Sequence, residues 1–316
     1  MAGKEKGRIL LAMTGLNPRP WYELLSQQRE VVTEPASAED PSITYAIVWK
    51  QRRNLLSKLP NLRAIFSIGA GVDHILADPT LPDVPIVRIV AENLTRHMTD
   101  FVLWRVLDHH RQGMAYRAQQ KRKVWRELPQ RPASDISVGI MGFGELGRAA
   151  AKALLVAGFH VNGWSRTERS MADVTTFHGE KGLTPFLNAT DILVVLLPLT
   201  AETTGIVNYK LLKQLKKRNG LGGAVLINAG RGRLQKDADI LKALEDGTLK
   251  EASLDVFEVE PLPKTSPLWN HPRVFVTPHA AATSDPAYLV GPMLEQMEAY
   301  ESGGKLKNLV DRKAGY

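Results

Sequence analysis

The sequence predicts an α/β protein with two doubly wound, parallel β-sheets. Two observations lead to this fold class. Short apolar segments of strand length alternate with helical segments along most of the 316 residues, a rhythm typical of parallel sheets. In addition, a glycine-rich turn at Gly142, Gly144 and Gly147 follows an apolar strand and precedes a helix, and the alternation then continues to the end of the chain.

The part of the chain before the glycine-rich turn predicts one sheet. Strands are expected at Ile9–Met13, Tyr45–Trp49, Ala64–Ile68 and Ile86–Ile89, and helices at Tyr22–Gln28 and Asn54–Leu59. A long amphipathic helix is expected from about Met98 to Gln119, because apolar residues recur there at helical spacing. A proline-bearing arm, Trp125–Pro132, then leads to the glycine-rich turn.

The part that starts at Ile136 predicts a second sheet. Six strands are expected at Ser137–Met141, His160–Trp164, Ile192–Leu196, Val225–Asn228, Glu251–Asp255 and Val274–Thr277. Six strands separated by helices fit a doubly wound sheet. An amphipathic helix at Tyr288–Glu301 is expected to return to the first domain.

The composition excludes several classes of protein. The chain has no cysteine, which rules out disulfides, thiolate metal sites and a cysteine nucleophile. No apolar run reaches the roughly 18 residues of a membrane span, and the charged start predicts a cytoplasmic protein. The formal net charge is +8, but its densest clusters, Lys121–Lys123 and Lys216–Arg218, are not interleaved with aromatic residues. A solvated basic surface is therefore favoured over nucleic-acid binding.

The glycine-rich turn predicts a dinucleotide site. Gly142 permits the tight turn, Gly144 lets the backbone approach a pyrophosphate, and Gly147 lets the helix pack closely on the strand. The N–H groups at the start of that helix bind phosphates. The next strand ends in Ser165-Arg166-Thr167 instead of the Asp or Glu that would accept from a ribose 2′-hydroxyl. A guanidinium suits a 2′-phosphate, so NADP(H) is favoured and NAD(H) is left open.

Three polar residues follow later strands of the second array, where open α/β sheets bind ligands. Arg231, Glu260 and His279 are the side-chain types that hydride transfer to a 2-keto acid requires. An arginine binds the substrate carboxylate and polarises the carbonyl, an imidazolium supplies the proton, and a carboxylate orients the histidine and favours its charged form. Each residue alone is weak evidence, because a histidine after a proline is more often structural. Their occurrence together after a dinucleotide turn favours the chemistry.

The chain resembles the D-isomer-specific 2-hydroxyacid dehydrogenases, and within them most closely the glyoxylate/hydroxypyruvate reductase A group. The family's motifs occur in its order at Gly69–Asp73, Gly142–Gly147, Leu197–Thr203, Asn228–Gly232, Leu254–Pro261 and Thr277–His279. Segments similar to the reductase group are Ala46–Trp49, Trp164–Thr167 and Val310–Tyr316.

The resemblance implies a Rossmann coenzyme domain, residues 100–283, inserted in a flavodoxin-like substrate domain, residues 1–99 and 284–316, in a homodimer paired through the long helix and the Trp125 arm. It implies that Arg231 binds the substrate carboxylate, that His279 is the acid/base and that Glu260 is its partner. The N–H groups of Gly71 and Val72 would meet the substrate carboxylate. The remaining implied cofactor contacts are Glu145, Leu146, Leu197, Pro198, Thr203, Ala229 and Asp255, the last beside the nicotinamide carboxamide.

The resemblance predicts NADPH-dependent reduction of glyoxylate and hydroxypyruvate to glycolate and D-glycerate. Two alternatives stay open: reduction of bulkier 2-keto acids such as aryl pyruvates, and a non-catalytic, nucleotide-sensing scaffold with the same fold. The substrate side chain is not readable from the sequence, because Trp49 is nearly as plausible a core residue as a residue of the substrate pocket.

Overall fold

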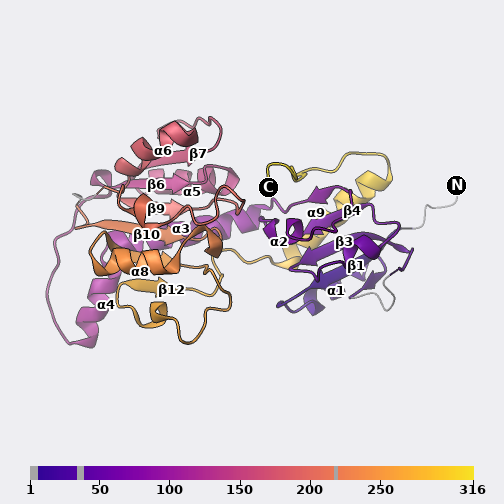
Figure 1. Ribbon diagram of the computed structural model, residues 1–316, viewed down its shortest axis with the longest axis horizontal. Coiled ribbons are helices and arrows are strands. Elements are labelled where there is room, and N and C mark those ends of the chain that lie inside the picture. Colours follow the sequence, from indigo (N-terminus) through magenta and orange to yellow (C-terminus); the bar gives the residue numbers. More distant parts are fainter. Residues whose placement is uncertain (1–5, 34–38, 217–219) are drawn as a thin grey trace. The chain divides into compact units, whose positions relative to one another are not determined.

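The computed structural model describes residues 6–33, 39–216 and 220–316, and the chain divides into two compact units. The first unit comprises Met1–Leu94 and Ser284–Tyr316, and the second comprises Thr95–Thr283. Each unit contains a parallel sheet, which confirms the predicted fold class (Figure 1).

The first unit contains a five-stranded sheet in the order β2-β1-β3-β4-β5. This is the flavodoxin-like strand order. The strands are β1 (Arg8–Met13), β2 (Val31–Val32), β3 (Ile43–Trp49), β4 (Ala64–Ser67) and β5 (Ile86–Val87). Its helices are α1 (Arg19–Leu25), α2 (Asp73–Leu76) and α9 (Pro286–Glu301). Leu289, Met293 and Met297 of α9 are buried in one cluster with Ile9 and Ile47, so the last helix returns to this unit as predicted.

The second unit contains a seven-stranded sheet in the order β12-β11-β10-β9-β6-β7-β8. The strands are β6 (Ser137–Met141), β7 (His160–Ser165), β8 (Val174–His178), β9 (Ile192–Val195), β10 (Ala224–Asn228), β11 (Leu249–Leu254) and β12 (Val274–Val276). The prediction of six strands was wrong because it lacked β8. Each residue of this edge strand is at least partly accessible, so it has no run of core side chains that would have indicated a strand.

Helices and helical turns connect the strands of the second unit. The α-helices are α3 (Glu92–His110), whose first residues belong to the first unit, α4 (Gly113–Lys121), α5 (Glu145–Val156), α6 (Gly179–Asn188), α7 (Tyr209–Leu212) and α8 (Asp237–Glu245). Short 3-10 turns occur at Ala133–Asp135, Gly232–Leu234 and Pro267–Asn270.

The predicted helix from Met98 to Gln119 is two helices, and this prediction was wrong in its continuity. Gln112 has a φ of 58°, in the left-handed region, and this residue separates α3 from α4. The break lets Arg117 of α4 donate two hydrogen bonds to the Asp108 carboxylate of α3, at 2.9 and 2.8 Å. An ion pair between the two helices therefore accompanies the break that the helical periodicity concealed.

The predicted helix at Asn54–Leu59 is a 3-10 turn over Leu56–Lys58. Asn54 has a φ of 61°, so the chain cannot enter an α-helix at that residue. Only one turn remains before Leu59 takes an extended conformation.

The predicted positions of the two basic clusters are tested in part. Lys121 is the last residue of α4, as expected for a basic cluster at a helix end. Lys217 and Arg218 lie outside the described residues. Within residues 6–33, 39–216 and 220–316, no helix has the length and hydropathy that a membrane crossing requires.

Candidate active site

The glycine-rich turn connects β6 to α5 (Figure 1), and the surroundings of Gly142 and Gly147 leave no room for a side chain. Gly142 has a φ of 111°, and a Cβ added there would lie 2.6 Å from the Leu196 carbonyl carbon. A Cβ added at Gly147 would lie 2.3 Å from the Gly142 carbonyl oxygen. The contact at Gly147 brings α5 close to the end of β6, and the contact at Gly142 brings the turn against the segment after β9. Both agree with the roles predicted for the first and third glycines.

Gly144 is the N-cap of α5, and unlike Gly142 and Gly147 it has open space around it. A Cβ added at Gly144 would meet no atom of the described residues within 4 Å. The helix then begins with Glu145 and Leu146, whose backbone N–H groups belong to the first turn and have no partner within the helix. An open glycine at the N-terminus of a twelve-residue helix fits a pyrophosphate.

The end of β7 carries the residues predicted to select the cofactor. The Ser165 hydroxyl donates to the Thr167 carbonyl oxygen at 2.7 Å, which turns the chain after the strand. Arg166 and Thr167 are exposed. The pKa of Glu202 is lowered, first by a hydrogen bond from the Thr200 hydroxyl and also by the positive charge of Arg166. The strand therefore ends in a cationic, accessible group.

The segment after β9 lies beside the glycine turn and contains three more predicted cofactor residues. Leu197 is buried, and its backbone nitrogen would lie 2.8 Å from a Cβ added at Gly142. The Thr203 hydroxyl donates to the Pro198 carbonyl oxygen at 2.8 Å and so braces this segment. Ala229, at the start of the segment after β10, donates its N–H to the Val195 carbonyl oxygen. These residues therefore come together at the carboxyl edge of the sheet.

Arg231 lies in the segment after β10, held by two buried amide side chains that sequence reasoning missed. The Asn228 side chain donates to the Arg231 carbonyl oxygen at 3.2 Å and to the Gln235 side chain at 2.7 Å. Gln235 in turn donates to the Val256 carbonyl oxygen at 3.2 Å. Arg231 itself donates from Nη1 to the Gly230 carbonyl oxygen at 2.9 Å. Asn228 begins the Asn-Ala-Gly-Arg-Gly motif, so its position in that motif was the available signal.

A close backbone contact places the Arg231 segment against the segment that leads to Glu260. A Cβ added at Gly232 would lie 1.7 Å from the Phe257 carbonyl oxygen. Only glycine permits this approach, since any side chain would overlap the backbone of the neighbouring segment. The glycine after Arg231 therefore fixes the separation of the two segments.

Glu260 and His279, which the sequence predicts to act as an acid–base pair, lie within hydrogen-bonding distance of each other. His279 Nδ1 lies 2.9 Å from Glu260 Oε2, and the side chains are 31% and 21% exposed. The second carboxylate oxygen of Glu260 accepts from the Phe257 N–H at 3.2 Å. The Glu260 carboxylate is thus held from both sides, and it orients the imidazole so that Nε2 is the ring nitrogen not engaged with Glu260.

The predicted substrate contacts of the first unit come from the ends of β3 and β4. The half-buried Trp49 packs on the chain after β4, because a Cβ added at Gly69 would lie 2.5 Å from its ring. Its ring centroid lies 4.6 Å from that of His74. Gly71 is partly accessible, and the buried Val72 is the N-cap of α2. Trp49 is therefore at the margin of the core beside the glycine-containing segment.

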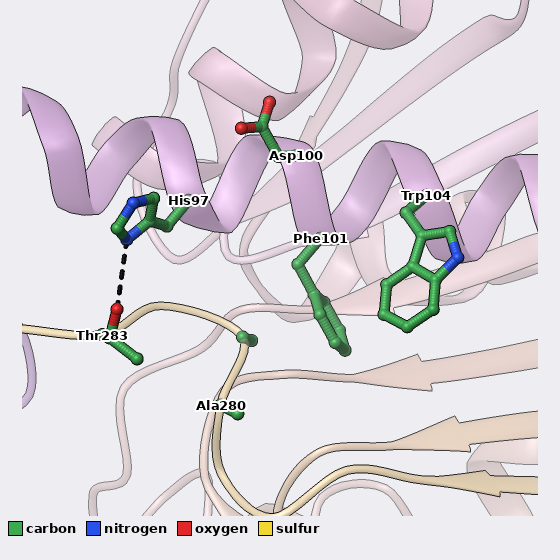
Figure 2. A pocket seen from close by; sticks show the side chains of 7 residues that line it. His97, Asp100, Phe101, Trp104, Ala280 and Thr283 are labelled. Carbon is green, nitrogen blue, oxygen red and sulfur yellow. Dashed lines mark hydrogen bonds between the residues drawn. The ribbon is translucent and has the colours of Figure 1, made fainter.

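A pocket of about 410 Å³ lies in the second unit beside the segment that follows His279 (Figure 2). Phe101 and Trp104 of α3 contribute apolar lining, and the Thr283 hydroxyl, also in the lining, lies 3.4 Å from His97 Nδ1. Its described lining does not include the predicted catalytic residues. The lining reaches Ala280, the residue that follows His279.

Comparison with known proteins gives consistent matches. Residues 103–281 match the family described as D-isomer specific 2-hydroxyacid dehydrogenase, NAD binding domain. The chain is 40% identical over 278 residues to glyoxylate/hydroxypyruvate reductase A of Salmonella paratyphi B, which covers 86% of this chain and 87% of that protein.

Two solved structures resemble nearly the whole chain. An NADPH-dependent glyoxylate/hydroxypyruvate reductase from Sinorhizobium meliloti, in complex with NADP and sulfate, is 45% identical with a TM-score of 0.93 over 98% of this chain and 100% of that one. A D-isomer specific 2-hydroxyacid dehydrogenase from Xanthobacter autotrophicus Py2, in complex with NADPH and MES, is 38% identical with a TM-score of 0.92 over the same shares. The architecture, the glycine turn and these matches lead to one conclusion: the chain belongs to the D-isomer specific 2-hydroxyacid dehydrogenase family.

Proposed function

We propose that this protein reduces glyoxylate and hydroxypyruvate to glycolate and D-glycerate with NADPH. The observation that carries the proposal is the Glu260–His279 pair, with 2.9 Å between Oε2 and Nδ1, in the unit that also contains the glycine turn. The names of the Salmonella paratyphi B and Sinorhizobium meliloti relatives support the choice of substrates. The second unit is proposed to bind the cofactor and to supply Arg231 and His279, and the first unit to supply the substrate contacts Trp49, Gly71 and Val72.

The proposed chemistry consumes one keto acid, one NADPH and one proton, and yields one hydroxy acid and NADP⁺. The reduced cofactor, when bound, supplies the hydride that reaches the carbonyl carbon. Arg231 binds the substrate carboxylate and polarises the carbonyl. His279 donates the proton from Nε2 to the carbonyl oxygen, while Glu260 accepts from Nδ1 and stabilises the charged ring before transfer. After transfer the imidazole is neutral and regains a proton from solvent.

The cofactor preference is proposed to come from the end of β7. Ser165 stands where a carboxylate would repel a 2′-phosphate, and the exposed Arg166 offers a guanidinium to bind one. Backbone N–H groups of Glu145 and Leu146 are proposed to bind the pyrophosphate, together with Gly144. Leu197, Pro198, Thr203 and Ala229 are the proposed remaining contacts, with Asp255 beside the carboxamide.

A steady-state panel tests this proposal. Glyoxylate, hydroxypyruvate and phenylpyruvate are each assayed with NADPH and with NADH, and His279→Ala is the inactive control. Turnover of the two small acids with NADPH, lost by roughly 10²–10⁴-fold in the control, supports the proposal. A preference for phenylpyruvate would favour the reductase of bulkier acids, in which case Trp49→Ala would be expected to alter that preference. NADPH binding without turnover of any acid would favour the scaffold.

A homodimer is proposed as the assembly. Trp125 is fully exposed, and Trp104 and Tyr116 are 48% and 40% exposed, all within the segment from α3 to the proline-bearing arm. Exposed aromatic side chains of this size indicate a contact surface. Light scattering at micromolar concentration is expected to give twice the chain mass, and Trp125→Ala to weaken the pairing. A cytoplasmic location also stays a prediction, to be tested by cell fractionation.

A further inference from the structure

The segment that carries His279 is attached to one buried carboxylate. Asp255, directly after β11, is fully buried. Its Oδ1 accepts from the Thr277 hydroxyl at 2.6 Å and from the Ala280 N–H at 2.8 Å, and its Oδ2 accepts from the Ala281 N–H at 3.0 Å. Its carbonyl oxygen accepts from the His279 N–H at 2.7 Å. Residues before and after His279 in the chain therefore form hydrogen bonds with the same residue, Asp255.

His279 has an unusual backbone conformation within this arrangement. Its φ is 54°, in the left-handed region that residues with a side chain rarely adopt. Such a conformation persists only where surrounding contacts impose it. The bonds to Asp255 supply those contacts, because they fix the residue two positions before His279 and the two residues after it.

The Thr277 hydroxyl is the one side-chain donor among these bonds. The other donors are backbone N–H groups, which any residue would provide. The segment therefore depends on a particular side chain at one position. A buried carboxylate that loses a donor is left with less compensation for its charge, so its remaining partners shift.

We infer that Thr277 is a positioning residue, whose hydroxyl completes the hydrogen bonding of Asp255 and so holds His279 in its left-handed conformation for proton donation. This inference rests on the proposed function, since it assumes that His279 is the proton donor. Thr277 acts through Asp255 and the backbone and does not contact the reacting atoms.

Thr277→Val tests the inference, with Thr277→Ser as the conservative rescue. Valine has nearly the shape of threonine but cannot donate to Asp255, whereas serine retains the hydroxyl. The valine variant is expected to lower kcat about tenfold, the effect of losing one hydrogen bond to a charged group. Its solvent isotope effect on kcat is expected to rise, because a misplaced donor makes proton transfer slower relative to other steps. Serine is expected to restore kcat and the isotope effect.

Thr190→Val is the matched control for stability. Thr190 is fully buried, and its hydroxyl donates to the Phe186 carbonyl oxygen at 2.7 Å within the second unit. This variant also loses one hydroxyl hydrogen bond, so a general loss of stability would appear in both proteins. Thr277→Ala also removes the hydroxyl, and it leaves space where the methyl group was. It replaces Thr277→Val in the same measurements if the valine variant folds poorly.

Each outcome decides the question. A kcat and isotope effect in Thr277→Val equal to those of Thr190→Val would overturn the inference, as would a serine variant as impaired as the valine variant. Because His279→Ala is assayed in parallel, the two hypotheses separate. If His279→Ala loses turnover while Thr277→Val does not, only the inference fails. If His279→Ala retains turnover, the proposed role of His279 fails and the inference with it. If the unmodified protein turns over none of the acids, the proposed function fails.

Discussion

Replacing Glu260 by glutamine tests how much of the activity depends on the pairing with His279. Glu260 uses both carboxylate oxygens: one accepts from the Phe257 N–H at 3.2 Å, and the other lies 2.9 Å from His279 Nδ1. Glutamine has the same shape but only one oxygen. Its amide nitrogen must therefore face one of two donors, either the backbone N–H or the protonated ring. One of the two hydrogen bonds is lost.

The size of the effect follows from the geometry. A hydrogen bond to a charged group contributes about 1.5–3 kcal/mol. The two side chains are 31% and 21% exposed, so solvent screens part of the interaction and the lower end of that range applies. A loss of about 1.5 kcal/mol corresponds to about a tenfold fall in kcat. KM for NADPH should not change, because the variant leaves the glycine turn intact.

The assay follows NADPH consumption at saturating keto acid, with Glu258→Gln as the matched control. Glu258 is a nearby carboxylate that accepts from the Asp237 N–H at 2.7 Å. Its variant should keep the kcat of the unmodified protein. A Glu260→Gln variant within twofold of the unmodified protein, or an equal loss in both variants, would refute the reasoning.

Three further predictions concern the cofactor, the substrate and stability. Arg166→Ala should lower kcat/KM for NADPH by about one to two decades and leave that for NADH unchanged. Equal efficiency with both cofactors in the unmodified protein would contradict this prediction. Arg231→Ala should raise the KM for the keto acid and lower kcat, and Arg231→Lys should restore little, because lysine cannot bind a carboxylate in bidentate fashion; full recovery with lysine would count against the role. Burial lowers the pKa of His109, whose Nδ1 lies 2.6 Å from Glu251 Oε2. The unfolded chain therefore binds a proton more readily, and the free energy of unfolding should fall as the pH drops below about 6.5, by at most about 1.4 kcal/mol per pH unit. Urea unfolding across this range should show a shallower pH dependence in His109→Gln, and identical slopes would rule the effect out.

Local patterns were sufficient to predict two parallel sheets, without β2 and β8, and to select the glycine turn, Arg231, Glu260 and His279 as candidate site residues, whereas further candidates came from the family resemblance. Apolar strand segments, the glycine turn and the polar residues after the strands are local features, and parallel sheets gather their carboxyl ends at one edge. That regularity is why Glu260 and His279, 19 residues apart, were expected to meet and do. The Ser165-Arg166 ending of β7 was likewise visible without a structure, because it depends on position after a strand.

Only the tertiary structure decided features that depend on contacts between distant segments. The break at Gln112 accompanies an ion pair between Asp108 and Arg117 that helical periodicity does not reveal. The edge strand β8 is held by pairing with β7 and lacks a buried face of its own. The bond from Thr277 to Asp255 joins residues 22 positions apart, and nothing in either local pattern indicates it. The physical reason is common to all three. Periodicity reports which side chains face a core, whereas a left-handed residue, an edge strand or a buried hydrogen bond is stabilised by the particular atoms that folding brings beside it.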